Sequence, residues 1–338
     1  MTYPAAARSL FSRRRLLVAS AAAATAAGLP GAFQPRTVRA EGVTLTLVAY
    51  STPREAYEAL IPMFAATEAG AGVTFEQSYG SSGDQSRAVE AGLPADIVAL
   101  SLEPDVTRLV KAGLVDETWN ADEYKGMVTD SVVAFGVRPG NPKAVAGWAD
   151  LLQDGIQVLT PNPLTSGGAR WNIMAAWGAL LKQGKTEDEA KAYLRDFFTH
   201  VPVQDKSARE SLQTFVGGVG DVLIGYENEL ELAITNGEEL EIVIPAETIL
   251  IENPVAVINA SANREKAQAF IDFLRSPEAQ KVFGENHYRP VVTEVYDTFD
   301  FVEPAELFTI ADLGGWSDVS AKFFDPDAGI VAEVQAQA

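Results

Sequence analysis

The chain has 338 residues, of which 47% are hydrophobic and 21% charged, a length and balance typical of a globular protein with room for two domains. Its 46 acidic residues outnumber the 26 basic ones, and the formal net charge of −20 argues against nucleic acid or an anionic membrane surface as a partner. No cysteine is present, so a disulfide framework, a thiolate metal site and a lipid-modified N-terminal cysteine are excluded.

Residues 1–40 have the composition of an export signal. Three consecutive arginines, Arg13–Arg15, precede an alanine-rich, weakly apolar run, and no acidic residue occurs before Glu41. The small-residue pattern Val38-Arg39-Ala40 offers a cleavage site, and the apolar run is too short to span a bilayer stably. Because the segment resembles a twin-arginine signal, we expect export of the already folded protein.

The chain after the signal repeats the order strand, turn, helix. Strands are predicted at 43–49, 72–78 and 94–100, and each is followed by a helical pattern. Thr52, Pro53 and Glu55 predict a capping box with proline at the first helical position. This repetition predicts a mostly parallel sheet covered by helices.

A second lobe is predicted after the apolar run Ser131–Val137, which ends in a cluster of turn-forming residues. Further strands are expected at 156–159, 201–203 and 221–226, with helices between and after them. The runs 241–245 and 254–259 predict the return crossing. We therefore expect a first lobe from residues 41–134 and 252–338, and a second lobe from residues 135–251.

The segment Thr160–Trp171, T-P-N-P-L-T-S-G-G-A-R-W, joins a predicted strand to a predicted helix. Ser166 stands at the N-cap position, and Gly167 and Gly168 leave the first-turn amides uncovered by side chains. Bare N–H groups at a helix start, together with the helix dipole, favour binding of an anion. A capped helix with glycines for tight strand–helix packing explains the same residues.

Other helix starts share this chemistry, because they combine small or hydroxyl residues and lack basic ones. They are Ser51-Thr52, Ser81-Ser82-Gly83 and Ser207-Ala208. Ligands of open α/β sheets bind outside the carboxyl ends of strands, where these loops are predicted to lie. Two facing lobes would bring the loops to one cleft, although each loop alone is also explained as a helix cap.

Six stretches carry a resemblance to the periplasmic sulfate- and thiosulfate-binding proteins of ABC importers. They are Y-S-T-P-R-E (Tyr50–Glu55), G-S-S-G-D-Q (Gly80–Gln85), T-P-N-P-L-T-S-G-G-A-R-W-N (Thr160–Asn172), D-V-L-I-G-Y-E-N-E (Asp221–Glu229), Y-R-P (Tyr288–Pro290) and G-G-W (Gly314–Trp316). The resemblance runs from about Val43 to Trp316. It implies an α/β, two-lobed periplasmic-binding-protein fold, in which each lobe is a mostly parallel sheet flanked by helices and the ligand cleft lies between them.

The resemblance also implies which residues hold the oxyanion. Ser82 would contribute its N–H and its hydroxyl, Ser166 its hydroxyl, and Gly167, Gly168 and Ala208 their amides. Two further positions depart from the family pattern. Ser51 stands where the family has aspartate, but the contact there resembles a backbone donation. Tyr226 stands where the family uses a tryptophan indole N–H, and a hydroxyl reaches differently and also accepts hydrogen bonds.

The function implied is capture of sulfate or thiosulfate by a non-enzymatic solute-binding protein, which delivers the anion to the permease subunits of an ABC transporter. We expect no cofactor or metal, an extracytoplasmic location and a monomer. Because Tyr226 replaces tryptophan, molybdate, tungstate and further tetrahedral oxyanions stay open as ligands. Two competing functions are a secreted hydrolase that uses carboxylates such as Glu227 and Asp84, and an iron-binding protein that uses Tyr226 and Glu227.

Overall fold

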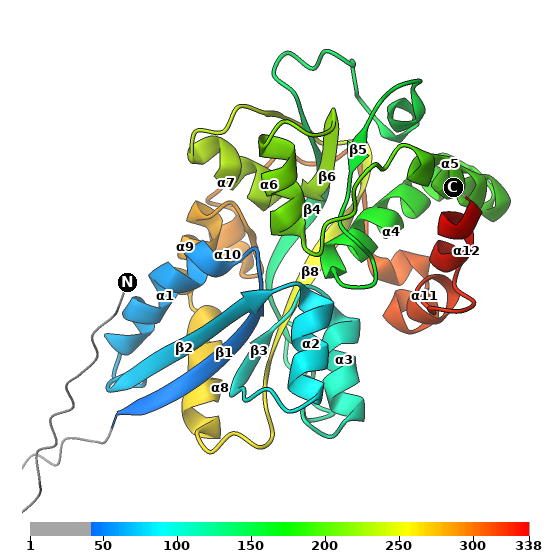
Figure 1. Ribbon diagram of the computed structural model, residues 1–338. Coiled ribbons are helices and arrows are strands. Elements are labelled where there is room, and N and C mark those ends of the chain that lie inside the picture. The colour runs from blue at the N-terminus through cyan, green and yellow to red at the C-terminus, as the bar shows by residue number, and fades with distance from the viewer. Residues whose placement is uncertain (1–41, 338) are drawn as a thin grey trace, which may run out of the picture. The chain divides into compact units, whose positions relative to one another are not determined.

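The fold is described for residues 42–337 by a computed structural model of the chain (Figure 1). The export signal predicted for residues 1–40 lies outside this range. The strands are β1 (Val43–Tyr50), β2 (Val73–Gly80), β3 (Ile97–Ala99), β4 (Met127–Val137), β5 (Val158–Leu159), β6 (Val222–Tyr226), β7 (Glu241–Val243), β8 (Glu247–Val257), β9 (Arg289–Pro290) and β10 (Glu306–Phe308).

Helices follow most of the strands. They are α1 (Arg54–Ala65), α2 (Ser82–Glu90), α3 (Glu103–Lys111), α4 (Gly167–Lys182), α5 (Glu187–Thr199), α6 (Ala208–Val216), α7 (Glu227–Thr235), α8 (Arg264–Leu274), α9 (Pro277–Glu285), α10 (Thr293–Tyr296), α11 (Gly315–Phe323) and α12 (Ile330–Gln337), with 3-10 turns η1 (Trp148–Leu152) and η2 (Ile310–Leu313). Across residues 42–337 we find no helix with the length and hydrophobicity needed to span a bilayer.

Two groups of strands meet along the pair β4 and β8. The strand order is β2-β1-β3-β8-β4-β6-β5. In addition, β10 pairs with β8, and both β7 and β9 pair with β4. The pairs β1–β2, β1–β3 and β5–β6 are parallel, whereas β8 runs antiparallel to β3 and to β4. The expected α/β architecture with covering helices is confirmed, but the sheet is mixed rather than mostly parallel, because β4 runs antiparallel to β6, β7, β8 and β9. The strands β4 and β8 carry the chain between the two groups.

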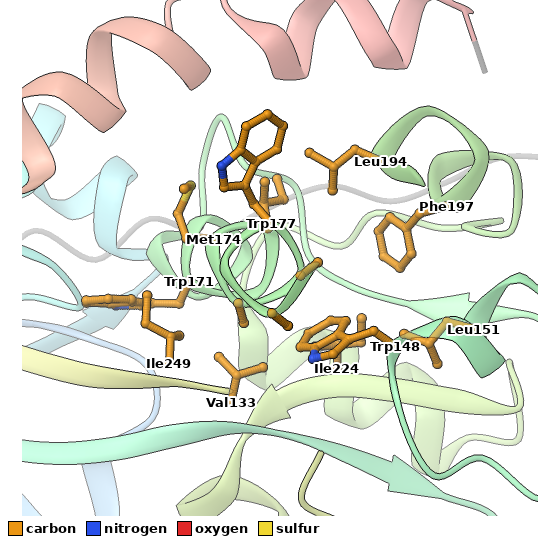
Figure 2. Packing of buried hydrophobic residues seen from close by; sticks show 14 of the residues in the cluster. Val133, Trp148, Leu151, Trp171, Met174, Trp177, Leu194, Phe197, Ile224 and Ile249 are labelled. Atoms are coloured by element: carbon orange, nitrogen blue, oxygen red, sulfur yellow. The ribbon is translucent and has the colours of Figure 1, made fainter. Parts of the chain in front are cut away.

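The largest buried cluster surrounds α4 (Figure 2). This helix is apolar on nearly all sides, as expected of a helix enclosed by other elements. Trp171 and Trp177 are 0% and 3% exposed, so the expectation that both pack in the core is confirmed. Trp171 meets Trp316 edge-on at 4.7 Å, and Trp177 meets Phe323 in the same way. Each such buried side chain contributes about 1.5–3 kcal/mol, which holds the start of α4 in place.

A second cluster packs α1, α8 and α9 against the strands β1 and β3. Phe270 lies at its centre, with ring centroids 5.1 Å from Phe64 and 4.6 Å from Phe75. This cluster supports the carboxyl end of β1, where the chain turns toward Ser51.

The last two helices pack on the elements around α4 rather than on β1–β3. In Figure 1, α11 and α12 lie beside α4 and α5, and Val331 and Val334 of α12 belong to the cluster that contains Trp177. The lobe boundaries expected at 134/135 and 251/252 stay a prediction. Helix α12 packs on α5, whereas α11 contacts α4 through Trp171 and Trp316 and also contacts α3.

Two local expectations from the sequence are wrong. Thr52 does not cap α1, because its hydroxyl bonds the Tyr288 hydroxyl at 3.0 Å and the helix begins after Pro53 with no side-chain cap. No strand forms at 201–203, where Pro202 lacks an N–H to donate to a neighbouring strand.

Candidate functional site

A small cavity lies where several strand ends and helix starts meet. It is lined by Tyr50, Ser51, Thr52, Ser81, Ser82, Ser101, Ser166, Gly167, Gly168, Ser207, Ala208 and Tyr226. All seven residues that the sequence predicted as ligand contacts are in this set. The starts of α2, α4 and α6 converge here, near the middle of Figure 1. Among residues 42–337, no charged side chain lines the cavity.

Main-chain N–H groups without an acceptor surround this cavity. Within residues 42–337, no acceptor is found for the amides of Ser51, Ser82, Gly167, Gly168 and Ala208. For the helix residues this follows from position, because the first amides of a helix have no carbonyl one turn earlier to bond. The neighbouring amides are occupied, since Gly83 N–H donates to Thr165 O at 3.0 Å and Ala169 N–H donates to Ser166 Oγ at 3.4 Å.

Three helix dipoles add to these donors. Each helix start carries the equivalent of about half a positive charge, and α2, α4 and α6 direct theirs to the same cavity. Desolvated N–H groups that converge from separate helices form a site for an anion without any basic side chain. The net charge of the chain does not oppose this, because exposed charges are screened beyond about 8–10 Å.

The two glycines at the start of α4 are required by close packing. A Cβ atom on Gly168 would lie 2.9 Å from Cε2 of Tyr226, and one on Gly167 would overlap the Ser101 hydroxyl. Any side chain here would therefore displace Tyr226 or Ser101. The expected cap is confirmed, because Ser166 caps α4 through its hydroxyl oxygen.

The hydroxyl of Ser82 is not free to donate to a ligand. It donates to the Asp105 carboxylate at 2.6 Å and accepts the Ser101 N–H at 2.9 Å. Asp105 is buried, and burial raises the pKa of its carboxyl, although Arg170 acts in the opposite direction. Of the two Ser82 donors that the resemblance implies, only the main-chain N–H remains available.

Tyrosine hydroxyls close one side of the cavity. Tyr226 and Ser101 share a hydrogen bond of 2.6 Å between their hydroxyls. The Tyr50 hydroxyl is buried near the hydroxyls of Thr52 and Tyr288, but within residues 42–337 none of its contacts has the geometry of a full hydrogen bond. A buried hydroxyl without a partner in a polar cavity indicates a place for a ligand or a water molecule.

The carboxylates near the cavity are turned away from it. Glu227 binds the guanidinium of Arg289 at 2.8 and 3.1 Å, and Asp84 binds Arg87 at 2.6 Å. Neither residue lines the cavity. Within residues 42–337 no group of three or more histidine, aspartate or glutamate side chains is arranged to hold a metal ion.

Five lining residues were not predicted as contacts from the sequence. They are Tyr50, Thr52, Ser81, Ser101 and Ser207. Ser101 follows the short strand β3, so the rule that ligands lie at the carboxyl ends of strands points to it as well. The loop after β3 carries only one small hydroxyl residue before the bulky Leu102, and so it lacked the repeated pattern of the other loops.

Solved structures and curated proteins resemble this chain over most of its length. The sulfate-binding protein SubI from Mycobacterium tuberculosis H37Rv has a TM-score of 0.82 and 45% sequence identity, over 84% of this chain and all of that one. A sulfate-binding protein of Synechococcus elongatus is 44% identical over 304 residues, 87% of each chain. A thiosulfate-binding protein of Pseudomonas aeruginosa is 34% identical over 301 residues, 85% of this chain and 90% of that one.

These similarities define the class of the molecule as a two-lobed periplasmic binding protein, and the fold expected from the resemblance is confirmed. A family model described as bacterial extracellular solute-binding protein matches residues 45–289. The chain belongs to this family, and its curated relatives are named as binding proteins rather than enzymes.

Proposed function

We propose that this protein captures sulfate or thiosulfate in the cavity and delivers it to an ABC importer. The observation that carries the proposal is the convergence of unpaired amides from Ser51, Ser82, Gly167, Gly168 and Ala208 on one cavity that is lined, within residues 42–337, by uncharged side chains. The hydroxyls of Ser166 and Tyr226 complete the donor set. Each bond from such a donor to a dianion contributes about 1.5–3 kcal/mol, which offsets the cost of removing the anion from water.

A cavity rich in N–H donors selects against protonated oxyanions. Sulfate at neutral pH has no proton, so each of its oxygens only accepts hydrogen bonds. Hydrogen phosphate carries a P–OH group that needs an acceptor, and an amide facing it leaves the proton without a partner. We therefore expect weak phosphate binding.

Molybdate and tungstate are the second candidates, and the Tyr226 hydroxyl is the feature that favours them. It replaces an indole N–H at the edge of the cavity, and its different reach changes the room for a larger tetrahedral dianion. The hydrolase and iron-binding functions receive less support, because Glu227 and Asp84 are each bound to arginine outside the cavity.

Binding is coupled to closure of two lobes in this proposal. The boundaries lie in β4 and β8, near residues 134/135 and 251/252. Contacts from both sides close over the cavity, including the Gly83–Thr165 main-chain bond and the Ser101–Tyr226 hydroxyl bond. The closed form, a monomer, would dock on the permease subunits.

The location follows from the family and from the first 40 residues. Extracellular solute-binding proteins act outside the cytoplasmic membrane, and the twin-arginine segment supports export in the folded state. Replacing Arg13 and Arg14 together with lysine should retain the full-length precursor inside the cell. Fractionation and immunoblotting measure this, and normal export of that variant would contradict the route.

Isothermal titration of the mature protein tests the ligand. The protein is first unfolded, dialysed and refolded to remove bound anion, and then titrated with sulfate, thiosulfate, molybdate and phosphate in separate experiments. We expect tight binding of sulfate or thiosulfate and little heat with phosphate. A large heat of binding with molybdate alone would support the second candidate. No heat of binding with any of the four anions, in folded protein, would reject an oxyanion site.

A further inference from the structure

A hydrogen bond joins the hydroxyls of Ser101 and Tyr226, and both residues line the anion cavity. Only one of the two hydroxyls keeps a proton that it can donate to a ligand. The oxygens lie 2.6 Å apart, and either can be the donor. Each hydroxyl has one proton, so whichever residue donates within the pair leaves the other proton free for the ligand. The direction of this bond therefore decides which residue contacts the anion as a donor.

The main chain of Ser101 is fixed on both sides of its side chain. Its N–H donates to Ser82 Oγ at 2.9 Å, and its carbonyl accepts the Trp171 indole N–H and the Asn253 amide, both at 2.9 Å. Its hydroxyl also packs against Gly167, where a Cβ atom would overlap it. Ser101 is thus held by residues of α2, α4 and β8 and has little freedom to turn.

Tyr226 is the better donor to an anion. A phenol is a stronger acid than an aliphatic alcohol, so its O–H forms the stronger bond to a charged acceptor. The edge of its ring packs beside Gly168, whose amide is one of the unpaired donors.

We propose that Ser101 is a positioning residue that donates its proton to the Tyr226 oxygen and so directs the Tyr226 O–H at the bound anion. Gly167 and Gly168 are both needed because they make room for this pair of hydroxyls as well as for the ligand. The inference rests on the proposed oxyanion function, and it assigns a role to a residue that the sequence motifs did not mark as a contact.

The test compares Ser101→Ala, Tyr226→Phe and the double variant by isothermal titration with sulfate and thiosulfate. Tyr226→Phe removes the donor and should weaken binding by about 10-fold or more, the loss expected for one bond to a charged group. Ser101→Ala leaves the donor less well directed and should weaken binding by a smaller factor. The double variant should match Tyr226→Phe, because Ser101 acts only through Tyr226.

Two results would overturn the inference while leaving the oxyanion function intact. A larger loss in Ser101→Ala than in Tyr226→Phe would mean that Ser101 itself donates to the anion. Independent, multiplying losses would mean that Ser101 has only a packing role. Ser211→Ala, which removes another buried serine hydroxyl away from the cavity, serves as the matched control, and thermal unfolding verifies that each variant is folded. If the wild-type protein binds none of the oxyanions, both the proposed function and this inference fail.

Discussion

Arg209 on α6 and Glu55 on α1 form a two-pronged ion pair beside the anion cavity, with N···O distances of 2.7 and 2.8 Å. The same guanidinium binds the buried Glu229 at 2.7 and 2.9 Å and the Thr52 carbonyl at 3.1 Å. The bonds to Glu55 and Thr52 connect the start of α6 to the start of α1. Arg209 directly follows the amide donor Ala208, and Thr52 directly follows the amide donor Ser51. Arg209 therefore links the two sides of the cavity.

Glu55→Gln should weaken sulfate binding by about fivefold, equivalent to about 1 kcal/mol for a partly exposed ion pair, if the pair belongs to the closed form proposed above. Burial opposes ionisation of Glu55, but the bonds from Arg209 outweigh it and lower the pKa of the carboxyl. Glu58→Gln on the exposed face of α1 is the matched control. Equal affinities of the two variants in calorimetric titration would mean that the pair does not contribute to closure.

Gly168→Ala should abolish measurable sulfate binding. The new Cβ atom would lie 2.9 Å from the Tyr226 ring and 3.2 Å from Cβ of Ala208, so the Tyr226 ring or the start of α4 would have to move and the donor geometry would change. Gly147→Ala has open space around the new atom and should bind as the wild-type protein does. Retained affinity in a well-folded Gly168→Ala protein, measured by titration and circular dichroism, would contradict the described packing.

The affinities of Ser82→Ala and Ser166→Ala should show which of the two serines binds the anion through its hydroxyl. Because the Ser82 hydroxyl is occupied by Asp105 and by the Ser101 N–H, its removal should lower stability by about 1–3 kcal/mol and change affinity by less than about threefold. Ser166→Ala removes a proposed ligand donor and should cost about 10-fold or more in affinity. The reverse order of affinities would mean that the Ser82 hydroxyl turns to the ligand.

Asp130→Asn should remove a pH-dependent loss of folding stability that arises where β4 and β8 pair. Asp130 pairs with Glu252 of β8 on one side and with Arg289 of β9 on the other. Its Oδ1 atom has no hydrogen-bond partner within residues 42–337. Burial raises the pKa of Asp130 well above its usual value, and the charge of Glu252 raises it further, while Arg289 acts against both. Burial also raises the pKa of Glu252.

The sign of the pH effect follows from proton binding. Between the unfolded pKa, about 3.9, and the higher folded pKa, the native state binds more protons than the unfolded state. The free energy of unfolding therefore falls as pH rises through this window. Urea unfolding should find Asp130→Asn more stable than the wild type at pH 8, with no gain at pH 4. The exposed Asp300→Asn is the control, and a gain independent of pH would contradict this origin.

Local patterns in the sequence were sufficient to predict most elements and the loops that form the cavity. The Ser166-Gly167-Gly168 cap is encoded within three residues. The strand before Glu227 is an apolar run, and the strand before Ser51 begins with valine and leucine alternating with threonine. What the sequence pattern could not predict were bonds between distant segments. Thr52 has the sequence of a cap, but Tyr288, more than two hundred residues later, takes its hydroxyl.

The state of the Ser82 hydroxyl and the role of Ser101 were hidden for the same reason. Asp105 and Ser101 follow β3, and only the packing of α2 against α3 brings them to Ser82. The carboxylate Glu227 was also ambiguous in sequence, because Arg289, which binds it, is distant along the chain. The pair of Asp84 and Arg87, by contrast, has the i, i+3 spacing of neighbours on one helix and could be predicted locally.

The crystal structure of the mature protein with sulfate tests the central claim most directly. We predict sulfate in the cavity between α2, α4 and α6, with its oxygens within hydrogen-bond distance of the amides of Ser51, Ser82, Gly167, Gly168 and Ala208 and of the Ser166 and Tyr226 hydroxyls. Sulfate bound elsewhere, or held in the cavity mainly by arginine or lysine side chains, would contradict an anion site built from main-chain donors.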